Sequence, residues 1–299
     1  MLPVVMLSSP DQFRIPYGIP GSPFVFTPYV EMRPAGNIEI HGDEITMDSE
    51  DMAILALVSK HLVVTAYQIH DFLSAMGAKP DGGYGSIFKR MDRLASAALL
   101  EKFEYSVAAS TRPGAFYKLG RRGGMLLRKN GIRPQKYDYL LTADLQKHFR
   151  LLAVNQFFSR KRITKNVILA HPLIAVEAPE TYTVRPQGIL QTDEKTYLLE
   201  AVRKGPGWEE ELTKKLARYD SLFRSGRELN TRLVSPAILL IAESAGHCRS
   251  IMEMTADNPV ELLYTSDDLI YSRPDEAIYR LEKKPRFWFD HIRDFLTRS

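Results

Sequence analysis

The chain has 299 residues, of which 44% are hydrophobic and 25% are charged, the balance of a globular protein with one or two domains. No apolar run reaches the ~18 residues that a membrane-spanning helix needs. The first residues lack the basic start of a signal peptide, so we expect a cytoplasmic protein that does not bind membranes. Cys248 is the only cysteine, which excludes an internal disulfide and a cysteine-based metal site.

Positive charge is concentrated in one segment of the chain. Residues 81–165 contain 18 Lys and Arg against 6 Asp and Glu, a net charge of +12, whereas the segments before and after it contain more acidic than basic residues. A basic block inside an otherwise acidic chain favours a polyanionic partner, and double-stranded DNA is the partner we expect.

Residues 1–48 contain seven prolines, which is too many for a regular helix or a central strand. Aromatic and aliphatic residues at 24–30 make this segment too apolar for a solvated tail. We therefore predict a proline-rich arm that packs on its own chain or on a partner subunit.

Residues 49–135 show the order of a winged-helix domain. Asp48 or Ser49 can cap a first helix, Thr65 and Gln68 have the spacing of a capping box at the start of a second, and Gly77 supplies its left-handed end. A third helix starts at about residue 84. Residues 100–105 and 115–119 alternate like the strands of a hairpin, and 121–130 predict a short basic helix.

The third helix divides into two faces. Ile87, Met91 and Leu94 recur at helical spacing and predict the buried face. The opposite face should enter the major groove of DNA, and basic residues near the hairpin tip and after the hairpin extend the positive surface. The predicted DNA-binding residues are Ser86, Lys89, Arg90, Arg93, Arg112, Arg121 and Arg122.

Strand and helix patterns alternate in the rest of the chain. We predict a helix over 142–158, strands over 166–175, 182–190 and 196–203, a helix over 208–223, a strand over 236–242, a helix over 248–254, a strand over 260–264 and a last helix over 286–297. The predicted fold class is α+β, with the winged helix followed by an α/β restriction-endonuclease-like domain over 136–299 that has a mixed sheet.

Nuclease domains of this order hold a divalent metal between a carboxylate that ends the second strand and another on the third strand, with a lysine two residues later. Here Gln187, Glu200 and Val202 stand at these positions. We favour a structural role for Glu200 and expect no catalysis, metal or other cofactor. The alternative is an Mg²⁺-dependent nuclease or nickase that uses Glu200, with Asp193 or Glu194 displaced into the site.

Three short segments carry a family resemblance: 145–155 (LQKHFRLLAVN), 184–188 (VRPQG) and 197–203 (YLLEAVR). They resemble the helix after the winged helix and the second and third core strands of plasmid replication-relaxation proteins. The chain departs from that family at Gln187, and at Val202, where an acidic residue is common, and both departures argue against metal-dependent cleavage.

The resemblance implies a DNA-binding protein of a plasmid or other mobile element, acting in replication, transfer or transcriptional control. We expect it to read its DNA site in a sequence-specific way as a homodimer, with replication or transfer proteins as further partners. A transcription regulator whose α/β domain senses a small molecule remains an alternative.

Overall fold

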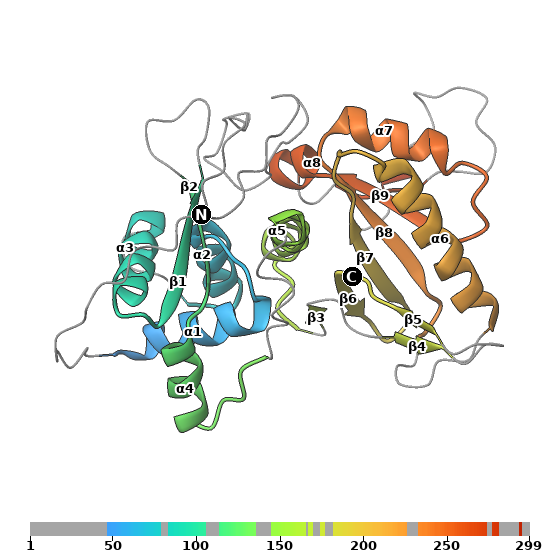
Figure 1. Cartoon of the computed structure of the whole chain (residues 1–299). Helices are drawn as coiled ribbons and strands as arrows, with labels where there is room; N and C mark the ends of the chain where they lie inside the picture. Colours follow the sequence, from blue (N-terminus) through green and yellow to red (C-terminus); the bar gives the residue numbers. More distant parts are fainter. Residues whose placement is uncertain are drawn as a thin grey trace. The chain divides into compact units, whose positions relative to one another are not determined.

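The computed structural model describes residues 47–78, 83–105, 114–135, 145–165, 167–169, 174–176, 182–225, 233–273, 277–280 and 293–294. These residues form two compact units, which divide after Thr164 (Figure 1). Nearly all of the predicted arm and Arg112 lie outside the described residues.

The first unit has the order of a winged helix, as predicted. Its elements are α1 (Ser49–His61), α2 (Ala66–Ala75), α3 (Gly83–Ser96), β1 (Leu100–Tyr105), β2 (Gly114–Leu119), α4 (Arg121–Lys129) and α5 (Leu145–Arg160). The helix starts follow the sequence signals: Asp48 caps α1 and Thr65 caps α2, each in a complete capping box. Gly77 adopts the left-handed conformation just after α2, with φ of +86°.

Strands β1 and β2 form an antiparallel hairpin in which Leu100 faces Leu119 and Tyr105 faces Gly114. A two-residue bridge joins the α1–α2 connection to this hairpin, because the backbone N–H of Val64 donates to Tyr117 O and that of Tyr117 donates to Val64 O. The hairpin is thereby fixed to the helices of the first unit.

Helix α5 belongs to the first unit, although we expected the domain boundary after residue 135. Its Asn155 side-chain amide donates to the carbonyl oxygens of His61 (2.9 Å) and Val63 (2.7 Å), and Gln68 Nε2 donates to Leu152 O (2.9 Å). All of these side chains are buried. Buried polar groups require partners, so these bonds keep α5 on the winged helix, and the compact units divide at 164/165.

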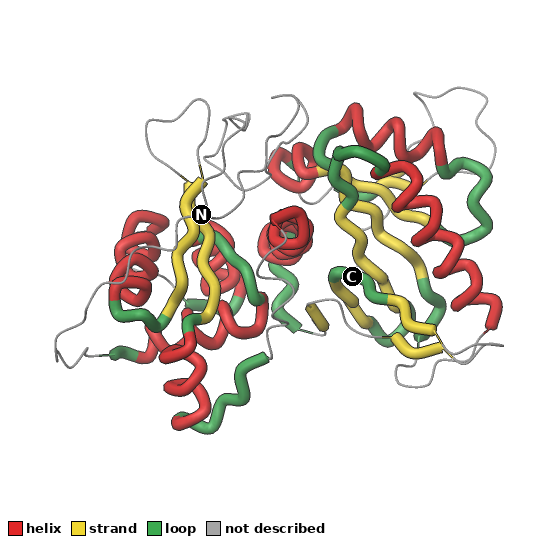
Figure 2. The backbone as a smooth tube through the Cα atoms, in the orientation of Figure 1, coloured by secondary structure: helices red, strands yellow, loops and turns green. Residues whose placement is uncertain are grey.

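The second unit is an α/β layer built on a mixed seven-stranded sheet (Figure 2). Its elements are β3 (Val167–Leu169), β4 (Ile174–Val176), β5 (Tyr182–Val184), β6 (Gly188–Gln191), β7 (Thr196–Ala201), α6 (Trp208–Ser225), β8 (Ala237–Ala242), α7 (Ala245–Met254), β9 (Leu262–Ser266), α8 (Asp267–Ser272), β10 (Tyr279–Arg280) and β11 (Arg293–Asp294).

The strand order of the large sheet is β11-β10-β9-β8-β7-β6-β3. Strands β3, β6 and β7 are antiparallel, α6 then leads to β8 parallel to β7, and β9 is parallel to β8. The predicted mixed sheet is therefore confirmed. The two predicted strands over 166–175 and 182–190 are each divided, and β4 and β5 pair in a small separate sheet. Pro186 interrupts the second of them because proline has no N–H for a strand ladder.

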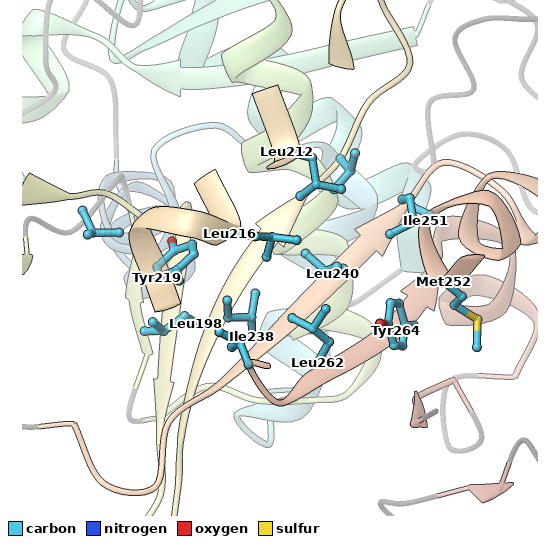
Figure 3. Close-up of a cluster of buried hydrophobic side chains, with 14 of the residues drawn as sticks. Leu198, Leu212, Leu216, Tyr219, Ile238, Leu240, Ile251, Met252, Leu262 and Tyr264 are labelled. Carbon is cyan, nitrogen blue, oxygen red and sulfur yellow. The ribbon is translucent and has the colours of Figure 1, made fainter. Parts of the chain in front are cut away.

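The core of the second unit lies between the sheet and its helices (Figure 3). Every residue of β8 is buried, as its unbroken apolar run AILLIA predicted. Helix α6 contributes Leu212, Leu216 and Tyr219 to this core, and α7 contributes Ile251 and Met252.

The prediction of a helix over 286–297 is wrong at residues 293–294, which form β11 and pair antiparallel with β10. Without β11, strand β10 would be the edge of the sheet, and its outer backbone N–H and C=O groups would lack partners. Pairing with β11 satisfies these groups. In the described part of the chain, no helix has the length and apolar character needed to cross a membrane.

Candidate nucleic-acid interface

Helix α3 has the two faces that its sequence predicted. Ile87, Met91 and Leu94 are completely buried against the rest of the first unit. On the other side, Lys89 is exposed and Ser86 is half-buried, and neither side chain has a hydrogen-bond or ion-pair partner among the described residues. These two side chains therefore remain available to an external ligand.

Arg90 and Arg93 lie on the same helix but are engaged within the protein. Arg90 bonds Asp48 Oδ2 (2.6 Å), Glu50 Oε2 (2.9 Å) and Asp51 Oδ1 (3.0 Å), and Arg93 Nη2 donates to Asp51 Oδ1 at 2.6 Å. The Asp51 side chain is fully buried. Its position in α1 makes it both a helix cap partner and the acceptor for two guanidinium groups, so the pair of arginines joins α3 to the start of α1.

The electrostatics of this cluster agree with its geometry. The hydrogen bond to Asp48 raises the pKa of Arg90. The backbone N–H of Asp51 and then the Arg90 guanidinium lower the pKa of Asp48. The outward spacing of Arg90 and Arg93 did not indicate this intramolecular role, because acidic partners 39 to 42 residues earlier in the chain supply it.

Other cations of the basic block are also used internally. Lys102 Nζ lies 3.0 Å from both Asp92 and Glu104, and Lys118, which is nearly buried, lies over the Phe103 ring. Burial lowers the pKa of Lys118. Four cations of the basic block, Arg90, Arg93, Lys102 and Lys118, therefore have acidic partners within the protein.

The free cations of the first unit include those of α4. Arg121, Arg122, Arg128 and Lys129 are exposed, and none of them forms an ion pair with any residue that the structure describes. We call these four side chains the α4 surface. Arg121 and Arg122 were predicted from the sequence as DNA-binding residues, whereas Arg128 and Lys129 were not among the predicted site residues.

Glu200, the remaining acidic residue of the nuclease pattern, is buried on β7 beneath α6. Lys215 Nζ lies 2.6 Å from its Oε2, and the Tyr219 hydroxyl donates to its Oε1. Burial, and then the Glu200 carboxylate, raise the pKa of Tyr219 well above its ordinary value. Both carboxylate oxygens thus have partners from α6, an arrangement that suits a structural ion pair.

Gln187 lies at the entrance to β6 and is also buried. Its side-chain Oε1 accepts a hydrogen bond from the backbone N–H of Ala201 (2.8 Å), and its backbone N–H donates to Leu199 O (3.1 Å). Gln187 therefore pairs the entrance to β6 with the end of β7, where the nuclease pattern would place a metal-binding carboxylate. Among the described residues, no three His, Cys, Asp or Glu side chains are grouped so as to hold a metal ion.

A buried polar cluster that the sequence did not indicate lies at the carboxyl ends of the parallel strands. Arg203 follows β7, Glu243 follows β8 and Asp267 follows β9, and all three are at most 4% exposed. Arg203 Nη2 lies 3.1 Å from Asp267 Oδ2, and Glu243 Oε1 accepts from the backbone N–H of Lys204. Charged residues of separate strands meet here because parallel strands end at one edge, so only the sheet topology reveals the cluster.

His247 completes this cluster from the first turn of α7. The backbone N–H of Glu243 donates to His247 Nδ1 (3.3 Å), which places the ring proton on Nε2. The imidazole ring also meets the Trp208 ring edge to face, with 4.6 Å between the ring centroids. Burial, and then Lys204 and Arg203, lower the pKa of His247 to about 3. The cluster is closed to solvent and ties the strand ends to the helices that follow them.

The comparisons with known proteins place these features in a family. A match to the family described as replication-relaxation spans residues 55–238, from α1 to β8. The chain belongs to the replication-relaxation family. Its family membership supports a DNA-related role for this replication-relaxation protein. Among solved structures, the operator-DNA complex of Bacillus subtilis PadR matches 37% of this chain and 68% of its own, with 17% identity and a TM-score of 0.24. No curated protein matches the replication-relaxation chain.

Proposed function

We propose that this protein binds double-stranded DNA through α3 and acts in the replication of a plasmid or mobile element, or in the control of its transfer or transcription. The observation that carries the proposal is that α3 presents Lys89 and Ser86 on the side away from its buried residues Ile87, Met91 and Leu94. Ammonium and hydroxyl groups contact phosphates and base edges, and a winged helix positions its third helix in the major groove.

The proposal gives Arg90 and Arg93 a supporting role. Their bonds to Asp51 hold α3 against α1, so α3 is presented as a rigid element, and rigid presentation lowers the cost of binding. We further propose that two copies of the chain read a palindromic site, since the symmetry of a dimer matches the symmetry of such a site.

The proposal is tested by the salt dependence of DNA binding. We expect Lys89→Gln to weaken binding and to reduce the slope of log K against log salt by about 1, because one phosphate contact releases about one counterion. The matched control is Lys214→Gln on α6, which removes an exposed ammonium group from the second unit and should leave the slope unchanged.

Two results would contradict the proposal. An unchanged slope in Lys89→Gln would remove α3 from the DNA contact. Cleavage of supercoiled DNA with Mg²⁺ by the wild-type protein, lost in Glu200→Gln, would instead favour a nuclease, in spite of the Lys215 and Tyr219 contacts to that carboxylate.

A further inference from the structure

The α4 surface is held rigidly at the base of the β1–β2 hairpin. A Cβ at Gly123 would overlap the carbonyl oxygen of Leu99, and a Cβ at Gly120 would lie 2.7 Å from Ala98 O. Leu127 on the same side of α4 is completely buried. The two glycines thus allow α4 to lie directly on backbone, so its outward side chains project from a fixed support.

The outward side of α4 carries cations in two aligned rows. Residues seven apart are displaced by about 10 Å along a helix and by only about 20° around it, so Arg121 aligns with Arg128 and Arg122 with Lys129. No Asp or Glu occurs anywhere between Glu104 and Asp138. Like charges on one helix face repel one another, and a bound polyanion would relieve this repulsion.

The α4 surface is separate from the outward residues of α3. Helix α4 follows the end of the hairpin where Leu100 pairs with Leu119, whereas the hairpin tip lies beyond Tyr105 and Gly114. Figure 1 shows α4 at the base of the hairpin and near α1, away from the end that leads to the tip. The last turn of α3 leads into this base, so Ser86 and Lys89 lie in the half of α3 that is farther from α4.

From this separation we propose that the α4 surface binds the phosphate backbone of a second DNA segment, so that one chain holds two duplex segments at once. The inference rests on the proposed function. The chemistry favours DNA over an acidic protein. A phosphate backbone requires only cations, whereas a protein interface requires an apolar or aromatic centre. Among the described residues on and just after α4, the exposed large apolar side chains are Met125 and Ile132, and neither is aromatic.

A bridging experiment tests the proposal. One duplex of about 30 base pairs of random sequence is immobilised and a second, fluorescent duplex of the same length is supplied in solution, because charge-driven binding needs no specific site. We expect the wild-type protein to capture the fluorescent duplex. We expect the fourfold variant Arg121→Gln, Arg122→Gln, Arg128→Gln and Lys129→Gln to capture about tenfold less of it while still binding the immobilised duplex.

The matched control removes the same charge from exposed helix faces of the second unit. It carries Lys214→Gln, Arg218→Gln, Arg224→Gln and Arg249→Gln, all at exposed positions, and should capture the second duplex as the wild type does. Glutamine has a helix propensity close to those of Lys and Arg, so thermal unfolding should show both variants folded.

Three outcomes would overturn the inference. Wild-type protein that binds one duplex but captures no second one lacks the second surface. Equal capture by the α4 variant would assign bridging to other residues, such as the two α3 helices of a dimer. Loss of all DNA binding in the α4 variant would show that α4 and α3 contact one segment. Failure of the proposed function is distinct, because it shows as an unchanged salt slope in Lys89→Gln, whatever the α4 variant captures.

Discussion

Asp51 has more contacts than its place in the sequence suggests. It lies in the first turn of α1 and completes the capping box with Asp48. It also accepts hydrogen bonds from Arg90 and Arg93 while fully buried. A buried carboxylate is stable only when its oxygens are paired. The two arginines of α3 therefore stabilise the fold in addition to adding positive charge to the surface.

We predict that Asp51→Asn lowers the free energy of unfolding by about 2 kcal/mol, because the substitution removes the buried negative charge and one of the two oxygens that accept from the guanidinium groups. Urea denaturation measures this change. The control is Glu104→Gln, which removes a half-exposed partner of Lys102 and should cost less than about 0.5 kcal/mol. Equal effects of the two substitutions would show that the Asp51 cluster is not a stabilising contact.

The contact between α5 and the α1–α2 connection depends on one buried pair of side chains. Asn155 uses both protons of its amide on the carbonyl oxygens of His61 and Val63, so its Oδ1 can only accept, and it accepts from His61 Nδ1 at 2.9 Å. The ring of His61 also stacks on Phe72. Burial lowers the pKa of His61 to about 3 in spite of the bond to Asn155.

This pKa shift predicts the direction of a pH effect. The imidazole of the unfolded chain takes up a proton below about pH 6.5, and the folded chain resists it down to about pH 3. Stability is therefore complete above pH 6.5 and is lost as the pH falls. Between pH 7 and pH 5 we expect His61 to account for a loss of about 2 kcal/mol.

Urea denaturation at the two pH values measures the loss, and His61→Gln provides the comparison. Glutamine can donate to Asn155 Oδ1 but does not titrate in this range, so the variant should lose clearly less stability on acidification. His247, whose pKa is also lowered to about 3, should keep part of the pH effect in the variant. An identical pH dependence in wild type and variant would mean that His61 is accessible to protons in the folded protein.

For the whole molecule, the position of α5 determines where the first folding unit ends. The compact units divide after Thr164, not after residue 135. Hydrogen bonds that satisfy buried groups of α1 and α2 come from α5. A winged helix that ends at 135 would therefore leave these polar groups without partners.

We predict that a fragment of residues 47–164 unfolds cooperatively in urea, whereas a fragment of residues 47–135 does not, because removal of α5 leaves buried polar groups unsatisfied at a cost of about 1–3 kcal/mol each. Circular dichroism during denaturation distinguishes the two fragments. The boundary after residue 135 would be restored if both fragments unfolded with the same midpoint and slope.

The local structure of the chain could be predicted from its sequence to a large extent. The cap of α1 at Asp48 or Ser49, the capping box at Thr65, the left-handed Gly77, the two faces of α3 and the buried strand β8 were predicted from short-range rules, because a residue and its neighbours determine caps, turns and periodicity. The order of elements was sufficient to predict a winged helix followed by a mixed sheet.

Only the tertiary structure showed which charged side chains are free. Arg90 and Lys89 are neighbours on one helix, yet Arg90 is paired with acidic residues about 40 positions earlier. Lys89 has no such partner among the residues that the structure describes. Glu200 likewise meets Lys215 and Tyr219 only because α6 folds back over β7. Helical spacing gives the direction of a side chain, but the position of its partner depends on long-range packing. The sequence by itself therefore determined the elements and the sign of the charge, and the fold decided which cations are left for a ligand.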